Sequence, residues 1–373
     1  MLSRLKFSID NLVNTMLDRL PADVIADGVF LDLAIGGGQF VKEIERRKRL
    51  AGKTDEEIAR TVYGVEENVL RRDYAVNKNK LAGTYKVGEF LELDFDVKFD
   101  VVIGNPPFKG QAQLHQKYFN KSVELVKTGG SVLCVQPSTV YFNKKEDTQK
   151  HSQIVRDNIN KYKTSVLFVN PRIFEEAAVY TDLAVAHLIK TPGTGTLETV
   201  TYSSGKQYSN VKLEDVTKTE LDPVVYSSIV KKYKAYVKEH GSILDVTVSD
   251  PSVKKAKITS QRGNIGGDDW YTFMPAPKRF WVNHGDYGIP AATDEIVENI
   301  YDYFTLNFTR FGLAIYKFAG DMHGGAMQGV PLVPFDKKYT DKELYDMIGL
   351  TKAERKAIDS FMPDYYERYN TKI

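Results

Sequence analysis

The sequence predicts an α/β protein with a doubly wound, mostly parallel sheet, followed by a second, irregular α+β domain. Up to Thr191, short apolar runs typical of buried strands alternate with stretches of helical periodicity. After Thr191 the alternation stops, and the composition shifts to Gly, Ser and Thr. A chain of 373 residues is long enough for two domains that each bury a core.

The elements of the first domain follow from their apolar spacing. Residues 8–20 show helical periodicity that Pro21 ends, and further helices are expected at 39–50, 67–81 and about 111–127, the last stopping at Gly129-Gly130. Buried strands are expected at Val29–Ile35, Thr61–Val65, Tyr85–Val87, Phe99–Ile103, Ser131–Gln136, Ser165–Val169 and Leu183–Ile189. Ligands of such a sheet bind at the carboxyl ends of its strands. The glycine cluster 36–38, Glu66 and residues 104–108 all fall there.

Three parts of the chain are expected: a sheet domain at 1–194, an irregular region at 195–335 and a helical tail at 336–373. In the tail, the apolar contacts are expected from Leu344, Ile348, Ile358 and Phe361. The formal net charge is only +2, but residues 231–283 hold ten Lys or Arg against five Asp or Glu. This basic segment is either a phosphate-contacting surface or a solvated face.

The composition excludes several classes of protein. A hydrophobic content of 42% and a charged content of 27% are typical of a folded globular chain. No apolar run reaches the roughly 18 residues of a membrane span, and the first residues do not have the pattern of a signal peptide. Cys134 is the single cysteine, which rules out an internal disulfide framework and a cysteine-built zinc site. We therefore expect a reducing, cytoplasmic location.

The most informative motif is Asn-Pro-Pro-Phe at 105–108, directly after the expected strand Phe99–Ile103. Paired prolines end a strand, and each proline keeps the residue before it extended. The result is a stiff loop in which the Asn105 side chain and the Pro106 carbonyl can accept the two hydrogens of an exocyclic amine, while Phe108 covers the ring. The alternative is a turn that only terminates the strand.

These residues resemble the amino-methyltransferases of the adenine-N6 DNA type. The segment Asp32–Phe40 matches that family's cofactor loop, Asp-Pro-x-x-Gly-x-Gly-x-Phe, with Leu33 in place of the proline. Glycines let the backbone approach a ligand closely, although a plain tight turn would also explain them. A dinucleotide site is disfavoured, because Val41 stands where that motif needs its third glycine.

The resemblance implies roles for further residues. Glu66 would accept the ribose hydroxyls of the cofactor, and Glu89 would meet its adenine, with Asp94 as a competitor for that role. Ser8 matches the segment at the methionine end, or else caps the first helix. The implied cofactor is S-adenosyl-L-methionine, bound by Ser8, Asp32, Ala34, Gly36, Gly38, Phe40, Glu66, Glu89, Phe90 and Asn105.

The carboxyl-terminal third strengthens the resemblance. The segments 308–311, 330–336, 339–345 and 349–354 follow the order seen in restriction-modification methylases of the Eco57I and EcoRI kind. The cofactor motif precedes the Asn-Pro-Pro-Phe motif, and the recognition region follows both, which is the gamma-type arrangement. The resemblance thus implies a Rossmann-like methyltransferase sheet at 1–194, target recognition at 195–335 and a helical tail.

The implied reaction is a direct displacement in which N6 of an adenine attacks the sulfonium methyl and S-adenosyl-L-homocysteine leaves. The catalytic residues would be Asn105, Pro106, Pro107 and Phe108. The adenine would be flipped out of double-stranded DNA. Neither a metal nor a covalent intermediate is needed, and Cys134 is interpreted as a core residue rather than a nucleophile.

Contacts to DNA are expected in the second domain, among basic residues interleaved with aromatic ones. The candidates are Lys254, Lys255, Lys257, Arg262, Trp270, Lys278 and Arg279. His284 and His323 have no metal-ligand spacing. No nuclease constellation stands out, so we expect methylation without cleavage.

Three other functions remain open from the sequence. An RNA base methyltransferase or a protein glutamine methyltransferase can use the same motif, and a degenerate fold could bind DNA without catalysis. The intact Asp32, Glu66 and Asn105 speak against the last of these. A prokaryotic or phage-infected cell is the expected setting, and monomer and dimer are both compatible with the sequence.

Overall fold

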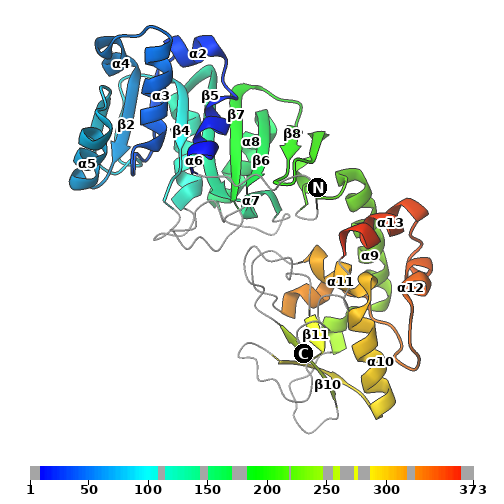
Figure 1. Cartoon of the computed structure of the whole chain (residues 1–373). Coiled ribbons are helices and arrows are strands. Elements are labelled where there is room, and N and C mark those ends of the chain that lie inside the picture. The colour runs from blue at the N-terminus through cyan, green and yellow to red at the C-terminus, as the bar shows by residue number, and fades with distance from the viewer. Residues whose placement is uncertain are drawn as a thin grey trace. The chain divides into compact units, whose positions relative to one another are not determined.

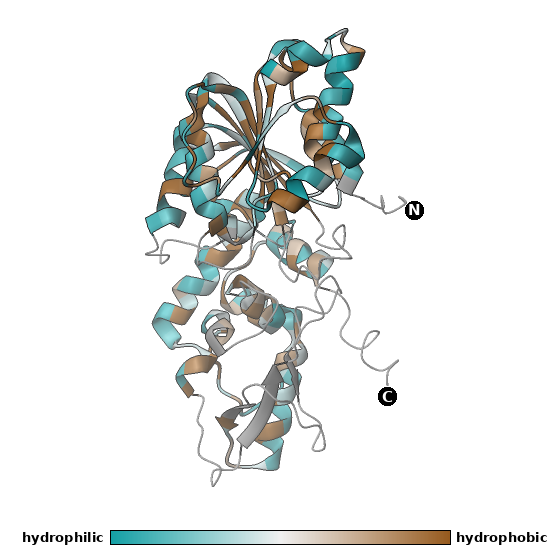
Figure 2. Cartoon of the chain, turned by 90° about the vertical axis from the view of Figure 1, so that its left-hand side faces the viewer, coloured by the Kyte–Doolittle hydropathy of each residue, from teal (hydrophilic) through white to brown (hydrophobic). Residues whose placement is uncertain are grey.

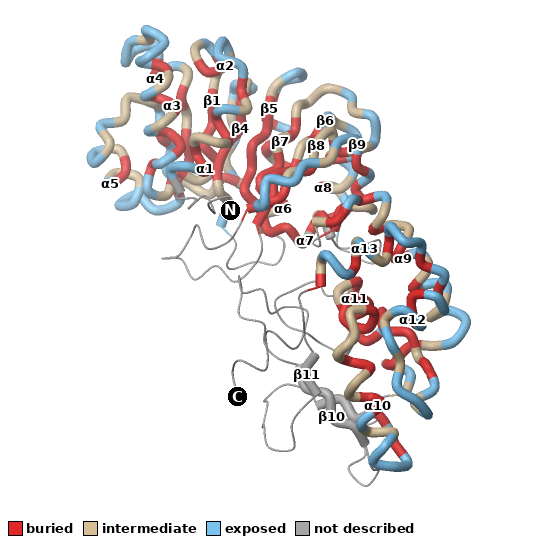
Figure 3. Tube along the Cα trace, turned by 45° about the vertical axis from the view of Figure 1, so that its right-hand side comes forward, coloured by how far each residue is buried: buried red, intermediate tan, exposed pale blue. Residues whose placement is uncertain are grey.

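The computed structural model describes residues 9–107, 114–142, 150–169, 183–217, 220–246, 255–260, 273–275, 286–316 and 324–362. The chain divides into two compact units, Met1–Val216 and Thr217–Ile373. Each unit has its own buried core (Figure 3).

The first unit is built on one sheet of nine strands in the described part of the chain, in the order β3-β2-β1-β4-β5-β7-β6-β8-β9. The strands are β1 (Phe30–Asp32), β2 (Val62–Glu66), β3 (Thr84–Val87), β4 (Phe99–Gly104), β5 (Val126–Pro137), β6 (Tyr162–Val169), β7 (Leu183–Pro192), β8 (Leu197–Thr201) and β9 (Gln207–Val211). Pairing is parallel from β3 through to β5, whereas β7 runs antiparallel to both β5 and β6. The predicted doubly wound, mostly parallel α/β sheet is confirmed.

Helices cover both faces of this sheet, so its strands form an apolar layer between more polar helices (Figures 1 and 2). One face packs against α1 (Ile9–Leu17), α2 (Ala22–Asp27), α3 (Gln39–Leu50), α4 (Asp55–Thr61) and α5 (Val69–Asn79). The other face packs against α6 (Leu114–Leu125), α7 (Thr139–Phe142) and α8 (Lys150–Lys161). Alternate residues of β5 serve the two faces: Cys134 lies in one core and Val135 in the other.

Several local expectations differ from the structure. The strand expected at Val29–Ile35 is shorter, because β1 covers only Phe30–Asp32 and the chain then turns into the glycine loop. The helix expected at 111–127 begins in the described residues at Leu114 and ends at Leu125. Val126 is already in β5, paired with Phe99, so Gly129 and Gly130 lie inside a strand rather than at a helix end. The short helix α4 has no counterpart in the predicted elements; its start is fixed by a capping box between Thr54 and Glu57.

The sheet continues beyond the boundary expected at residue 194. β8 pairs with β6, and β9 pairs with β8. Leu197, Val200 and Val211 are buried in the core that faces α6 and α8. The unit therefore extends to Val216, because these short strands need the sheet to bury their apolar side chains.

The second unit combines helices with a small antiparallel sheet, as the α+β expectation states. Its elements are α9 (Pro223–His240), η3 (Ile243–Val246), β10 (Lys255–Ser260), β11 (Phe273–Pro275), β12 (Asp286–Pro290), α10 (Asp294–Thr305), α11 (Asn307–Ile315), η4 (Gly324–Gly329), α12 (Asp341–Met347) and α13 (Lys352–Phe361). The three strands pair in the order β11-β10-β12. In the described residues no helix combines the length and the apolar character needed to cross a membrane.

The helical tail belongs to the core of this second unit. Leu344, Ile348 and Ile358 are buried in it, and Phe361 packs against it, as their spacing predicts. Residues 341–361 therefore close the same core that α9, α10 and α11 build, rather than forming a separate part.

Candidate active site

The site lies where the direction of the sheet's winding changes. From β1 the chain moves outward to β2 and β3, then returns to place β4 on the other side of β1. Neighbouring crossovers diverge at such a switch point and leave a crevice at the carboxyl ends of the two strands. Asp32 ends β1, Gly104 ends β4, and Asn105 follows Gly104 directly.

The glycine loop joins β1 to α3. Gly36 and Gly38 have φ values of +53° and +83°, which side chains rarely adopt, and Gly38 is the N-cap of α3. A Cβ on Gly38 would lie 2.8 Å from the side-chain nitrogen of Asn79, which itself donates to the Gly37 carbonyl. The loop is therefore held close to α5, and only glycine fits its last position.

Glu66, at the end of β2, ties this loop to the sheet. Its carboxylate accepts hydrogen bonds from the backbone N–H of Gly36 at 3.0 Å and of Asn68 at 3.2 Å. Arg71 Nη1 lies 3.4 Å from the same carboxylate. Glu66 is buried, so these bonds fix both its orientation and the path of the loop. The expected role toward a ribose remains a prediction.

Asp32 is fully buried between the loop and β4. Its Oδ1 accepts a hydrogen bond from Ala34 N at 3.0 Å, whereas Oδ2 has no hydrogen-bond partner among the described residues. Burial raises the pKa of Asp32 to about 7, and the negative charge of Glu66 acts in the same direction. A cationic group that reached Oδ2 would reverse this shift.

Gly104 lets β4 approach Asp32. Its φ is +151°, and a Cβ there would lie 2.9 Å from both Asp32 Oδ1 and Leu33 Cγ. Sequence reasoning did not single out Gly104; its place immediately before the Asn-Pro-Pro segment is the available signal. Gly104 therefore brings the start of the Asn-Pro-Pro-Phe segment into close approach with Asp32, at the start of the glycine-loop segment.

Asn105 carries the most informative atom of the site. Its Oδ1 is buried and lacks a hydrogen-bond partner in the part of the chain that the structure describes. A buried carbonyl oxygen without a partner costs about 1–3 kcal/mol, so it is retained at a functional position more readily than in a core. Pro106 is buried and Pro107 is exposed, while Phe108 lies outside the described residues.

The segment after β3 is held against α6. Phe90 is buried with its ring centroid 4.9 Å from that of Tyr118, and Lys121 Nζ donates to the carbonyls of Leu91 and Leu93. Phe90 is thus a core residue that positions the segment. Glu89 is half-buried at the carboxyl end of β3, and its competitor Asp94 is exposed.

The remaining predicted residues divide into two groups. Ala34 lies in the loop and Phe40 is buried on α3. Ser8, Lys254, Arg262, Trp270, Lys278 and Arg279 lie outside the described residues, and Lys255 and Lys257 lie on β10, of which only the backbone is described. Within the residues that are described, no cluster of three or more His, Cys, Asp or Glu side chains could hold a metal ion.

Two polar residues at the end of β5 escaped the sequence reasoning. Gln136 and Ser138 are fully buried, and neither Gln136 Oε1 nor Ser138 Oγ has a hydrogen-bond partner within the described ranges. The signal that could have revealed them is a glutamine inside an otherwise apolar strand, Val-Leu-Cys-Val-Gln-Pro.

Comparison with protein families gives a match for most of the first unit. Residues 6–167 match the family described as methyltransferase small domain. No curated protein matches the chain. The match assigns a methyltransferase fold to residues 6–167, and S-adenosylmethionine is the methyl donor that such a domain implies.

Several solved structures are similar to the chain. The type I restriction enzyme EcoKI M protein is 21% identical, with a TM-score of 0.43 over 54% of this chain and 49% of that one. A modification subunit of a putative type I restriction enzyme from Vibrio vulnificus is 16% identical, with a TM-score of 0.40 over 66% and 57%. A putative RNA methyltransferase from Pyrococcus horikoshii is 17% identical, with a TM-score of 0.34 over 48% and 84%. The chain thus spans about half the length of the EcoKI M protein.

Proposed function

We propose that this protein is a DNA methyltransferase that transfers a methyl group from S-adenosyl-L-methionine to N6 of an adenine flipped out of double-stranded DNA. The observation that carries the proposal is the buried Oδ1 of Asn105, an acceptor without a partner among the described residues, at the switch point of a methyltransferase domain. The motif around it, and the order of motifs along the chain, resemble the adenine-N6 enzymes.

The residues of the switch point fit the cofactor. Glycines at 36 and 38 keep the loop backbone open to a ligand, and a Cβ on Gly36 would meet only the Ala34 carbonyl, at 3.9 Å. The buried Oδ2 of Asp32 offers an acceptor to a cationic or N–H group, and Glu66 is the carboxylate at the end of β2. When bound there, S-adenosyl-L-methionine supplies an electrophilic methyl group on a sulfonium.

Asn105 and Pro106 would orient the attacking amine. Asn105 Oδ1 accepts one N6 hydrogen and the Pro106 carbonyl accepts the other, which directs the nitrogen lone pair toward the methyl group. As the nitrogen gains positive charge, both hydrogen bonds strengthen, so the pair stabilises the transition state more than the bound substrate. The paired prolines restrict the backbone that carries these acceptors.

A base inside a duplex cannot reach Asn105. Its Oδ1 is buried, so the adenine must leave the stack and the residues around Asn105 must move to admit it. We propose that the second unit binds the duplex and recognises its sequence. This unit contains the basic segment 231–283, which has ten Lys or Arg and five Asp or Glu.

The proposal is tested by mapping methylated bases in DNA from cells that express the chain, compared with Asn105→Ala and Asn105→Asp. We expect N6-methyladenine at one short motif, its loss in Asn105→Ala, and partial retention in Asn105→Asp, because a carboxylate oxygen still accepts an N–H. Each variant is checked for folding by thermal unfolding. Methylation that persists unchanged in Asn105→Ala, or methyl groups found only on RNA or protein, would overturn the proposal.

A further inference from the structure

The carboxyl end of β5 holds a polar pair inside an apolar core. Gln136 Nε2 donates a hydrogen bond to Tyr141 Oη, and Gln136 Oε1 is left without a partner in the described ranges. Ser138 Oγ, one residue after β5 ends at Pro137, also lacks one. Gln136 Oε1 and Ser138 Oγ thus have hydrogen-bonding capacity that the described core does not use. An apolar residue at position 136 would avoid the cost of desolvating the free amide oxygen.

This polar end lies at the same edge of the sheet as Asn105. β4 and β5 are neighbouring parallel strands, paired through Gly104 and Cys134. Asn105 follows Gly104 by one residue, and Gln136 follows Cys134 by two. Both residues therefore belong to the carboxyl edge at which a flipped base would have to enter.

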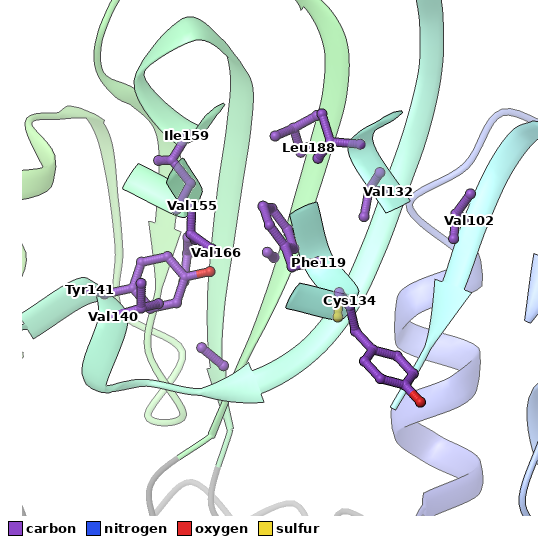
Figure 4. Packing of buried hydrophobic residues seen from close by; sticks show 14 of the residues in the cluster. Val102, Phe119, Val132, Cys134, Val140, Tyr141, Val155, Ile159, Val166 and Leu188 are labelled. Carbon is purple, nitrogen blue, oxygen red and sulfur yellow. The ribbon is translucent and has the colours of Figure 1, made fainter. Parts of the chain in front are cut away.

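Tyr141 fixes the position of the amide. It is buried in the core that faces α6 and α8, with its ring edge-on to Phe168 at 5.9 Å between centroids. Figure 4 shows Tyr141 among Val140 and Val155, on the side of the sheet that also carries Cys134. Burial raises the pKa of Tyr141, so its hydroxyl stays protonated.

A tyrosine hydroxyl donates as readily as it accepts, so it can satisfy either atom of a side-chain amide. Turning the Gln136 amide exchanges which atom faces Tyr141 without losing that hydrogen bond. The other atom then offers either an acceptor or an N–H donor to a base bound at this edge of the sheet. An exocyclic amine on adenine stands beside a ring nitrogen that accepts a hydrogen bond, whereas guanine carries an N–H at the same ring position.

We propose that Gln136 is a specificity-determining residue that donates a hydrogen bond to the ring nitrogen beside the reacting amine, with Tyr141 as its positioning residue. The inference rests on the proposed function and names the part of the target base that the pocket reads. Asn105 would bind the exocyclic amine, and Gln136 would donate to the ring nitrogen next to the carbon that bears this amine. A base with an N–H at that ring position would be rejected, because two donors would then face each other.

The test is a cycle of protein and base substitutions in a duplex that carries the mapped target site. The base change is 1-deazaadenine for the target adenine, which replaces the ring nitrogen by C–H. In the wild-type protein we expect it to lower kcat/KM for the duplex by about tenfold. In Gln136→Leu we expect adenine itself to react about tenfold more slowly, with no further loss for 1-deazaadenine.

Two more variants make the test independent of folding. Gln136→Met keeps the length of the side chain without its polar atoms, and Tyr141→Phe keeps the ring but frees the amide. Gln136→Met should behave like Gln136→Leu, and Tyr141→Phe should lose part of the sensitivity to 1-deazaadenine. The affinity for S-adenosyl-L-homocysteine, measured by calorimetry, should stay within about twofold of wild type, because none of these residues belongs to the proposed cofactor site.

The outcomes separate the two levels of the proposal. If the variants react with adenine as the wild type does, or keep the full sensitivity to 1-deazaadenine, the role of Gln136 is refuted while adenine methylation stands. If the wild-type protein methylates no adenine in any duplex, the proposed function fails, and the inference fails with it.

Discussion

At the scale of single residues, the site depends on acceptors that the protein leaves unpaired. Asp32 Oδ2, Asn105 Oδ1 and Gln136 Oε1 are all buried without a hydrogen-bond partner in the described part of the chain. Each lowers the stability of the folded protein, and each occurs at the carboxyl end of a strand in the first unit. A cofactor or base that bonded to these oxygens would raise the free energy of unfolding again, because it would bind only the folded protein.

The pKa of Asp32 predicts a dependence of stability on pH. Burial raises this pKa from 3.8 to about 7, so the folded state binds the proton more tightly than the unfolded state does. The wild-type protein should therefore lose stability relative to Asp32→Asn as the pH rises from about 4 to about 7, and the difference should be constant above that range. Urea unfolding of both proteins across this range measures it. A difference that does not change with pH would show that Asp32 titrates normally.

Gly104 should be intolerant of a side chain. In Gly104→Ala the new Cβ would meet Asp32 Oδ1 and Leu33 Cγ at 2.9 Å, in addition to the strain of a positive φ. Gly129→Ala is the matched control, since Gly129 has a φ of +82° but nothing within 4 Å of its Cβ position. We expect the control to lose about 1–2 kcal/mol of stability and Gly104→Ala to lose a further 1–3 kcal/mol or so, with weaker binding of S-adenosyl-L-homocysteine. Equal losses in the two variants would remove the steric argument.

Candidate site residues that stand in motifs were easier to recognise in the sequence than the residues around them. Asn105, Asp32 and Glu66 stand in recognisable motifs at strand ends, and the structure brings all three to one edge of the sheet. Gly104 and Gln136 have no motif of their own. Their importance comes from a close approach and from a missing partner, which depend on strand pairing rather than on local sequence.

At the scale of elements, glutamate side chains cap two helices of the second unit, and one of them also links its helix to α9. The helices α12 and α13 both begin with a capping box, formed by Thr340 with Glu343 and by Thr351 with Glu354. Glu343 is exposed, whereas Glu354 is buried and also accepts hydrogen bonds from Ser228 and Lys232 of α9. Glu354 therefore caps one helix and links it to another.

This difference predicts unequal effects of the same substitution. Glu343→Ala should lower the melting temperature only slightly, because Glu343 is exposed and its hydrogen bonds are screened by solvent. Glu354→Ala should cost about 1–3 kcal/mol more, because two charge-assisted or buried hydrogen bonds to α9 are lost as well. Thermal unfolding of the two variants side by side measures the difference. Similar melting temperatures would contradict the assigned link between α13 and α9.

Element boundaries depended on contacts that the sequence does not reveal. The periodicity over 111–127 is helical, yet Val126 leaves the helix because it pairs with Phe99 in the sheet. The stretch after Thr191 is rich in Gly, Ser and Thr, and its two short strands become stable only by pairing with β6 and with each other. Long periodic helices and apolar strands, by contrast, were predicted close to their observed positions.

At the scale of the whole molecule, the chain comprises two units with separate cores, Met1–Val216 and Thr217–Ile373. The first holds the candidate active site, and we propose that the second reads DNA. With this boundary, β8 and β9 belong to the first unit. A boundary at residue 194 would remove six buried residues from its hydrophobic core: Leu197, Val200, Tyr202, Val211, Leu213 and Val216.

Truncations test this division. A fragment of residues 1–216 should unfold cooperatively in urea, whereas a fragment of residues 1–194 should be much less stable or fail to fold, because each lost apolar side chain withdraws about 1.5–3 kcal/mol of burial. Circular dichroism during urea titration compares the two fragments. A fragment 1–194 as stable as 1–216 would mean that β8 and β9 are an accessory to the sheet.

The central claim is that one edge of the sheet holds both the methyl donor and an exocyclic amine of adenine. The most direct test supplies S-adenosyl-L-methionine with a labelled methyl group to a mixture of duplex DNA, RNA and protein, and identifies the labelled product by mass spectrometry after digestion. The account predicts N6-methyldeoxyadenosine, formed by the wild type and lost in Asn105→Ala. Label on another nucleoside, on an amino acid, or in equal amount with Asn105→Ala would contradict it.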